Sequence, residues 1–416
     1  MKAKRFTYHW AIVIACFILM ASSVGITQNC FNLFSIEIMN ELKFTASQVQ
    51  VMNTIATLMT MVSALVVGTV FNKFSMRLAM PVYAICLTGG FFLYSTVNSL
   101  AQLYILSALV GFGRGGVAVV PCGLLMNNWF KEKRGFATGI ALAGSTAGGF
   151  VFVRIANAII ASMDWRRAYM VLGVMAAVLI IPTVIFVIRE KPEDKGLRPY
   201  GATDEDTASA VKAEFTGISR KKFLKTSAFW MLGITFFLIS AINMGLQNNV
   251  SIYLTMQKGQ TRELAADDAS ILLLSQVVGK ILLGSIYDKK GVKFGSAYGC
   301  VVFLLSIVTI MLAGNKAFAI IFGVIVGLAL SMTTCTPPLL TSLAVGRREY
   351  SSIYGLLNAF ATAGVALGPV IAGFIYDHTE SYDLAWIIFA VVAVVILVLT
   401  ILAMNKSKGY SSMTEG

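Results

Sequence analysis

Charged side chains are scarce in this sequence. Asp, Glu, Lys and Arg make up 13% of its 416 residues, and 57% are hydrophobic, whereas a soluble domain carries about 25% charged residues. A water-soluble fold cannot bury that much apolar surface. Twelve stretches approach or exceed the roughly 20 apolar residues that cross a bilayer as a helix, and they predict an all-α membrane protein. They cover 9–34, 46–71, 77–97, 101–127, 134–161, 166–188, 226–255, 264–288, 293–314, 317–344, 350–376 and 381–405.

Groups that commonly carry catalysis are also lacking. The six cysteines show neither paired nor metal-ligand spacing, and the two histidines, His9 and His378, lie at the ends of predicted spans, which predicts no metal site and no histidine proton relay. The spans contain no candidate nucleophile with a base. We therefore expect no enzyme and no cofactor. A receptor would need a sizeable soluble output domain, and no segment is long enough to form one.

Acidic residues are absent from the spans except near their ends, yet three cations lie within them: Arg114, Arg154 and Lys280. A cation at the bilayer centre costs about 2.5–3.5 kcal/mol on insertion scales, so it normally faces a polar cavity or a partner. An anionic substrate would supply the missing charge. Two alternatives stay open: Arg114 bonds to backbone carbonyls among its flanking glycines, and Arg154 extends outward to the interface.

The excess of basic residues encodes topology. With the N-terminus inside, 24 of the 33 Lys and Arg residues fall in inside segments, 6 in outside loops and 3 within spans. This bias predicts both termini in the cytoplasm. The net charge of +13 therefore reflects orientation in the lipid bilayer, and we expect no nucleic-acid partner. We expect a monomer in the cytoplasmic (inner) membrane.

The chain contains an internal repeat with a spacing of about 216 residues. The segment Gly68-Thr-Val-Phe-Asn72-Lys73 returns as Gly284-Ser-Ile-Tyr-Asp288-Lys289, and Gly111 and Pro121 return as Gly327 and Pro337. The repeat predicts two six-helix halves, 1–188 and 226–416, joined by a cytoplasmic linker at 189–225.

Two such halves resemble the major facilitator superfamily, which implies a substrate site near the midplane between them. The run Gly284-x-x-x-Asp288-Lys289-Lys290-Gly291-x-Lys293 resembles that superfamily's signature loop and implies a gating role. The first copy, with Asn72, Lys73 and Arg77, has lost the acid to Asn72 and the glycine to Ser75, so a charged gate is not expected there. The alternative for both loops is a purely topological role.

A narrower resemblance begins at Trp129-Phe130-Lys131-Glu132-Lys133-Arg134-Gly135. This segment is similar to the entry of the fifth helix in the oxalate/formate antiporter and monocarboxylate transporter group. In that group an arginine of the eighth helix pairs with the substrate carboxylate, and Lys280 stands at a similar position. Proton-coupled members carry an acid four residues earlier, where this chain has Gln276. The resemblance therefore favours anion exchange over proton symport.

Amide side chains complete the candidate substrate site. Gln28, Asn29 and Asn32 lie on the predicted first helix, and Asn248, Asn249 and Tyr253 on the seventh; hydrogen bonding between helices is the alternative account of them. With Lys280, Arg114, Arg154 and Gln276, they predict a secondary active transporter that moves a small mono- or dicarboxylate by alternating access. The alternative function is efflux of amphipathic drugs or metabolites.

Overall fold

The computed structural model describes residues 8–202, 217–260, 262–313, 316–346 and 349–412. The long regular elements in these ranges are helices. The chain divides into two compact units. Unit 1 comprises Met1–Glu132 and Ile140–Ala202, and unit 2 comprises Lys133–Gly139 and Thr203–Gly416. Each unit is described by itself below.

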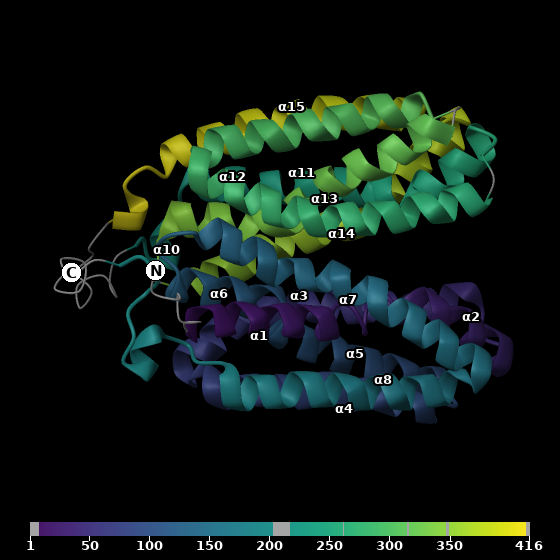
Figure 1. Ribbon diagram of the computed structural model, residues 1–416, viewed down its shortest axis with the longest axis horizontal. Helices are drawn as coiled ribbons and strands as arrows, with labels where there is room; N and C mark the ends of the chain where they lie inside the picture. Colours follow the sequence, from purple (N-terminus) through teal and green to yellow (C-terminus); the bar gives the residue numbers. More distant parts are fainter. Residues whose placement is uncertain (1–7, 203–216, 261, 314–315, 347–348, 413–416) are drawn as a thin grey trace, which may run out of the picture. The chain divides into compact units, whose positions relative to one another are not determined.

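Unit 1 is a bundle whose helices run side by side (Figure 1). Hydrogen-bonding side chains start several of them: Thr45 forms a capping box with Gln48, and the carboxylate of Asp164 accepts from Arg167 N at 2.7 Å. Its helices are α1 (Tyr8–Ser23), α2 (Phe31–Leu42), α3 (Ala46–Lys73), α4 (Met76–Leu93), α5 (Leu100–Val117), α6 (Val119–Trp129), α7 (Arg134–Ser162) and α8 (Trp165–Pro182). The start of α7, up to Gly139, belongs to unit 2.

Unit 2 is a second bundle with longer helices (Figure 1). The long element α12 bends at Gly291, whose φ of 75° and ψ of −177° are not helical. Glycine reaches this conformation without the steric cost that a Cβ imposes. The helices are α10 (Arg220–Phe223), α11 (Ser227–Ile252), α12 (Arg262–Met311), α13 (Lys316–Val345), α14 (Tyr350–Thr379) and α15 (Asp383–Lys406).

The predicted number of spans agrees with the described helices. Ten segments are long and apolar enough to cross a membrane, and one of them, Ile271–Met311, contains both limbs of the bent α12. The helix α1 is apolar but shorter. Counting α1 and both limbs of α12 gives the twelve predicted spans.

The predicted first span is not one continuous helix. α1 ends at Ser23, and turns occupy residues 24–30 before α2 begins. The Ser22 and Ser23 hydroxyls donate to the carbonyls of Ile18 and Leu19 at 2.6 and 2.5 Å, and such back-bonding bends helices. Gly25 lies against the backbone of Gly148 on α7. Hydropathy alone does not detect this break.

The predicted fourth span is also divided, into α5 and α6. The break falls at Ala118, with φ of −89° and ψ of −116°. Pro121 lacks the N–H that would bond to the carbonyl of Val117, so one helical hydrogen bond across this break is missing. The repeated proline, Pro337, and its neighbour Pro338 lie inside α13 without ending it.

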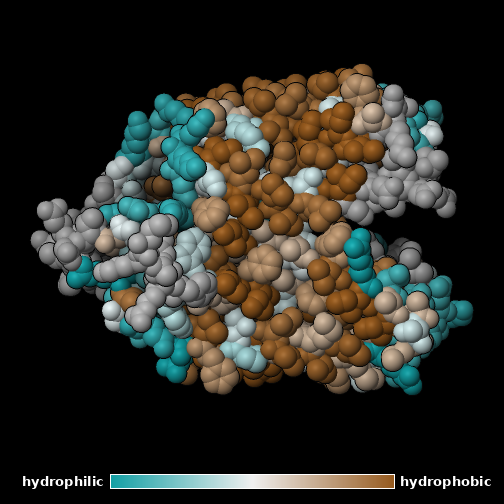
Figure 2. All heavy atoms as spheres, in the orientation of Figure 1, coloured by the Kyte–Doolittle hydropathy of each residue, from teal (hydrophilic) through white to brown (hydrophobic). Residues whose placement is uncertain are grey.

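Large apolar side chains cover the outer faces of the helices. Figure 2 shows hydrophobic residues over the middle of the helices and hydrophilic residues toward their ends. Leu78 and Phe186 are each 71% exposed, and Val370 is 63% exposed. Exposed apolar surface of this extent marks contact with lipid.

The described parts of the predicted linker attach to different units. The indole of Trp129 donates to the carbonyl of Arg189 at 2.9 Å, within unit 1. In unit 2, Arg220 N donates to the Glu349 carboxylate at 3.2 Å. Residues 203–216 lie outside the described ranges.

Candidate functional site

Arg114 is a buried cation of unit 1. It lies in the last turn of α5 and is 4% exposed. Its Nε donates to the hydroxyl of Thr60 on α3 at 3.1 Å, and that hydroxyl donates in turn toward the carbonyls of Ala56 and Gly111. No carboxylate within the described ranges lies within ion-pair distance of the guanidinium. Arg114 is therefore oriented by a neutral group.

Close packing of α5 against α3 surrounds Arg114. A Cβ on Gly111 would collide with the backbone of Ala56, and one on Gly115 would meet the Ser63 side chain at 2.5 Å. The glycines thus let α5 approach α3 closely, as small residues do at membrane helix interfaces. The described hydrogen bond of Arg114 goes to the Thr60 side chain. The alternative drawn from the sequence is a bond to backbone carbonyls among its flanking glycines.

Lys280 is the buried cation of unit 2. It is 1% exposed on the first limb of α12, and its carbonyl accepts from the Cys335 thiol of α13 at 3.7 Å. Gln276, one turn earlier, is 7% exposed. Gly327 of α13 lies against the backbone of this same turn. Both polar residues are therefore enclosed where α12 packs on α13.

Arg154 has a different environment. Its side chain on α7 is exposed, and its guanidinium lies over the Phe150 ring with 4.0 Å between the guanidinium carbon and the ring centroid. This cation–π contact stabilises the charge without a carboxylate. Arg154 is thus the least buried of the three cations.

The amides expected on the first helix lie in the turn between α1 and α2. Gln28 and Asn29 are both exposed, and Asn29 Nδ2 donates to the carbonyl of Ser145 on α7 at 3.1 Å. The side chain of Asn32 lies outside the described set. Because the first span is broken here, Gln28 and Asn29 extend from a turn and not from the face of a continuous helix.

The polar residues at the end of α11 belong to a network within unit 2. The Tyr253 hydroxyl donates to the Asp383 carboxylate at 2.7 Å. Asn249 is buried and bonds to Gly245 O at 2.8 Å, while its Oδ1 accepts from the Tyr382 hydroxyl at 3.2 Å. Asn248 is exposed. Interhelical bonding thus accounts for Asn249 and Tyr253 in this structure.

The acid of the signature loop binds the N-terminus of α7. Both carboxylate oxygens of Asp288 accept backbone N–H bonds at 2.7 Å, one from Gly135 and one from Phe136. Gly284 lies against the backbone of Gly135, so neither position has room for a side chain. A carboxylate at a helix N-terminus is favoured by the helix dipole. The four-residue spacing between Gly284 and Asp288 therefore places the carboxylate at the start of α7.

The remaining signature residues lie on the surface of their own units. Lys289 and Lys293 are exposed on either side of the bend at Gly291. In unit 1, Lys73 and Arg77 are exposed, and Lys73 Nζ lies 5.6 Å from the centroid of the Phe74 ring. The side chain of Asn72 lies beyond the described set.

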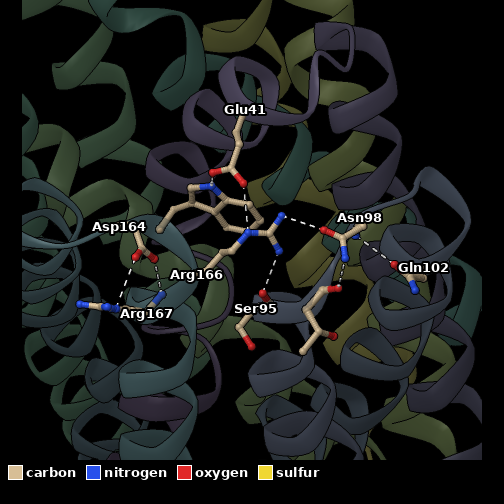
Figure 3. Close-up of polar contacts among 9 residues, drawn as sticks. Glu41, Ser95, Asn98, Gln102, Asp164, Arg166 and Arg167 are labelled. Carbon is tan, nitrogen blue, oxygen red and sulfur yellow. Dashed lines mark hydrogen bonds and ion pairs between the residues drawn. The ribbon is translucent and has the colours of Figure 1, made fainter.

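One polar cluster was not singled out from the sequence. Arg166, at the start of α8, bonds to Glu41 at 3.1 Å, to Ser95 O at 2.9 Å and to Asn98 at 3.0 Å (Figure 3). It joins the ends of three segments of unit 1. The repeat offered a signal, because Arg166 and Asp383 are charged residues 217 positions apart at the start of the last helix of each half. Within the described ranges, no group of three His, Cys, Asp or Glu side chains could hold a metal ion.

A family model described as Major Facilitator Superfamily matches residues 12–360 and 269–415. The chain belongs to the major facilitator superfamily. Monocarboxylate transporter 12 of Mus musculus is 25% identical over 404 residues, covering 91% of this chain and 82% of the relative. The oxalate:formate antiporter of Oxalobacter formigenes is 26% identical over 234 residues, covering 56% of this chain and 52% of the relative.

Solved structures show the same fold. The human organic anion transporter MFSD10 matches with a TM-score of 0.71 at 11% identity, covering 94% of this chain and 99% of the other. The E. coli fucose:proton symporter matches with a TM-score of 0.69 at 13% identity, covering 95% and 98%. These likenesses confirm the predicted all-α fold. Membership of the family makes the chain a multi-pass membrane transporter of small molecules. Transport, and not catalysis, is the activity that its family indicates.

Proposed function

We propose that this transporter carries a small organic anion, a mono- or dicarboxylate, by alternating access. The observation that carries the proposal is Arg114, a guanidinium 4% exposed whose described partner is the neutral hydroxyl of Thr60. Burial of a charge is costly unless another charge or polar groups compensate it. A carboxylate cargo would provide that compensation while it is bound.

Lys280 is the second proposed substrate ligand. It is the buried cation of unit 2. Lysine binds as a point charge, whereas the planar fork of arginine matches both oxygens of a carboxylate. In the proposed division of roles, Arg114 orients the carboxylate and Lys280 adds charge. Arg154, Gln276, Gln28, Asn29, Asn32, Asn248, Asn249 and Tyr253 are the further candidates.

The relatives support this cargo class. The names of two of them specify monocarboxylates and the oxalate/formate pair. Gln276 in place of an acid favours exchange of one anion for another over proton symport. In the proposed cycle, the hydrogen bonds between Asp288 and the start of α7 form or break as the transporter changes state. Lys289, Gly291 and Lys293 of the same loop share this proposed gating role.

The proposed setting is the cytoplasmic membrane, with both termini and the linker on the cytoplasmic side. The distribution of Lys and Arg supports this orientation. A monomer is the proposed oligomeric state.

Uptake into proteoliposomes tests the cargo class. Labelled mono- and dicarboxylates are offered to vesicles loaded with unlabelled carboxylate, with a labelled sugar and a labelled organic cation as comparison substrates. We expect at least one carboxylate to enter faster than in protein-free vesicles. Robust uptake of the sugar or the organic cation with no uptake of any organic anion would refute the proposal.

A further inference from the structure

An open recess lies at the bend of α12. It has a volume of about 490 Å³ and lies between the loop around Gly291 and the end of α15. Three lysines line it, Lys290, Lys293 and Lys408, and among the described residues no Asp or Glu does. The exposed residue Asn405 also lines it. The recess therefore offers concentrated positive charge and hydrogen-bonding groups.

The charge of these lysines is not neutralised by a described carboxylate. All three side chains are exposed, and Lys290 Nζ lies 4.2 Å from the centroid of the Phe294 ring. The nearby acid of the loop, Asp288, is bonded to the start of α7. No ion pair to Lys290, Lys293 or Lys408 occurs within the described ranges. The recess is thus suited to an anion from outside the protein.

The internal repeat gives an independent reason to expect an anion here. Met76, the first residue of α4, and Val292, the first residue after the bend, are 216 positions apart, which is the repeat spacing. In unit 1, a carboxylate oxygen of Glu190 accepts from Met76 N at 3.2 Å. Unit 1 therefore places its own anion at this corner, whereas the corresponding corner of unit 2 is a lysine-lined recess.

The surroundings of the recess distinguish a lipid from a soluble anion. Apolar side chains of Leu343, Ile401 and Met404 form part of its wall. Exposed apolar residues continue along both helices beside it, with Phe294, Val301 and Leu305 on α12 and Val398 and Leu402 on α15. α12 and α15 pack against each other. Such a surface accommodates acyl chains.

We infer that this recess binds the headgroup of an anionic phospholipid, with its phosphate among Lys290, Lys293 and Lys408 and its acyl chains along α12 and α15. Basic recesses beside membrane helices commonly bind anionic headgroups, and each lysine near the surface contributes about 1 kcal/mol. The lipid would stabilise the bend at Gly291 by joining it to the end of α15. This site is independent of the proposed carboxylate cargo.

Lipid titration tests the inference. The full chain, purified in an uncharged detergent, is titrated with phosphatidylglycerol, phosphatidylcholine and glycerol phosphate. The variant Lys290→Gln/Lys293→Gln/Lys408→Gln is compared with Lys195→Gln/Lys221→Gln/Lys225→Gln, which removes the same charge from exposed lysines that do not line the recess. We expect the first variant to lose affinity for phosphatidylglycerol on the order of 100-fold, at about fivefold per lysine.

The comparison ligands separate the possible occupants. The control variant is expected to retain wild-type affinity for phosphatidylglycerol, and glycerol phosphate is expected to compete poorly because it lacks acyl chains. Unchanged affinity in the recess variant, or equal loss in both variants, would overturn the site. If glycerol phosphate binds as tightly as phosphatidylglycerol, the recess holds a soluble anion and the lipid assignment fails.

Discussion

Lys280 is 1% exposed, although lysine is among the residues that are least often fully buried. A buried ammonium group loses its hydration and needs compensating polar groups. Arg114 presents the same problem in the other half, with the Thr60 hydroxyl as its described partner.

Neutralising Lys280 tests its proposed contact with the carboxylate. Lys280→Gln removes the charge but keeps a polar side chain, so we expect folded protein with strongly reduced carboxylate transport. Losing one partner of a buried charge pair costs about 2–5 kcal/mol, or at least roughly 30-fold in binding. Lys280→Arg is the matched variant and should retain more transport. Equal activity of Lys280→Gln and the wild type would contradict the assignment.

Arg114 and Arg154 differ in burial. Arg114→Gln should reduce carboxylate transport more than Arg154→Gln, because Arg114 is enclosed beside Thr60 whereas Arg154 is exposed over Phe150. Initial rates of uptake at several substrate concentrations give the comparison. A larger loss for Arg154→Gln would assign the orienting role to Arg154 instead.

At the scale of elements, glycines determine how closely the first turn of α7 and the first limb of α12 approach within unit 2. Gly284 and Gly135 lie backbone to backbone, and Asp288 one turn later bonds to the N–H groups at the start of α7. The signature motif therefore combines a contact without side chains and a charge at a helix end. This combination explains why its glycine and its acid are four residues apart.

Adding a methyl group tests this contact. A Cβ at position 284 would lie 2.6 Å from the carbonyl carbon of Gly135, whereas one at Gly373 would have no atom within 4 Å. Gly284→Ala should therefore lower the thermal unfolding midpoint, with a cost of about 1–3 kcal/mol from overpacking. Gly373→Ala should be neutral or stabilising by about 0.5–1 kcal/mol, because alanine favours the helix. Similar effects of the two substitutions would count against a close contact.

Hydropathy was sufficient to predict the helical fold and to place three cations within the spans. The structure buries Arg114 and Lys280 and leaves Arg154 exposed. Hydropathy and the repeat could not predict the turn at Gln28 and Asn29, because serine back-bonding and the packing of Gly25 decide it. They also did not reveal that Asp383 binds Tyr253. Side-chain direction depends on helix rotation and on partners distant in sequence, which a linear pattern does not specify.

At the scale of the whole molecule, the basic residues predict orientation. In a cysteine-free background, Lys43→Cys and Lys316→Cys should react with an impermeant maleimide added to intact cells. Lys73→Cys and Lys408→Cys should react only after the membrane is opened, because the inside segments hold most of the Lys and Arg residues. Labelling of Lys408→Cys in intact cells would contradict cytoplasmic termini.

Carboxylate counterflow is the most direct test of the whole account. Proteoliposomes loaded with unlabelled carboxylate and placed in a trace of labelled carboxylate should accumulate label with the wild-type protein. The variant Lys280→Gln/Arg114→Gln should fall to the level of protein-free vesicles while remaining folded by thermal unfolding. Accumulation by the double variant at the wild-type rate would contradict the claim that the buried cations bind the cargo.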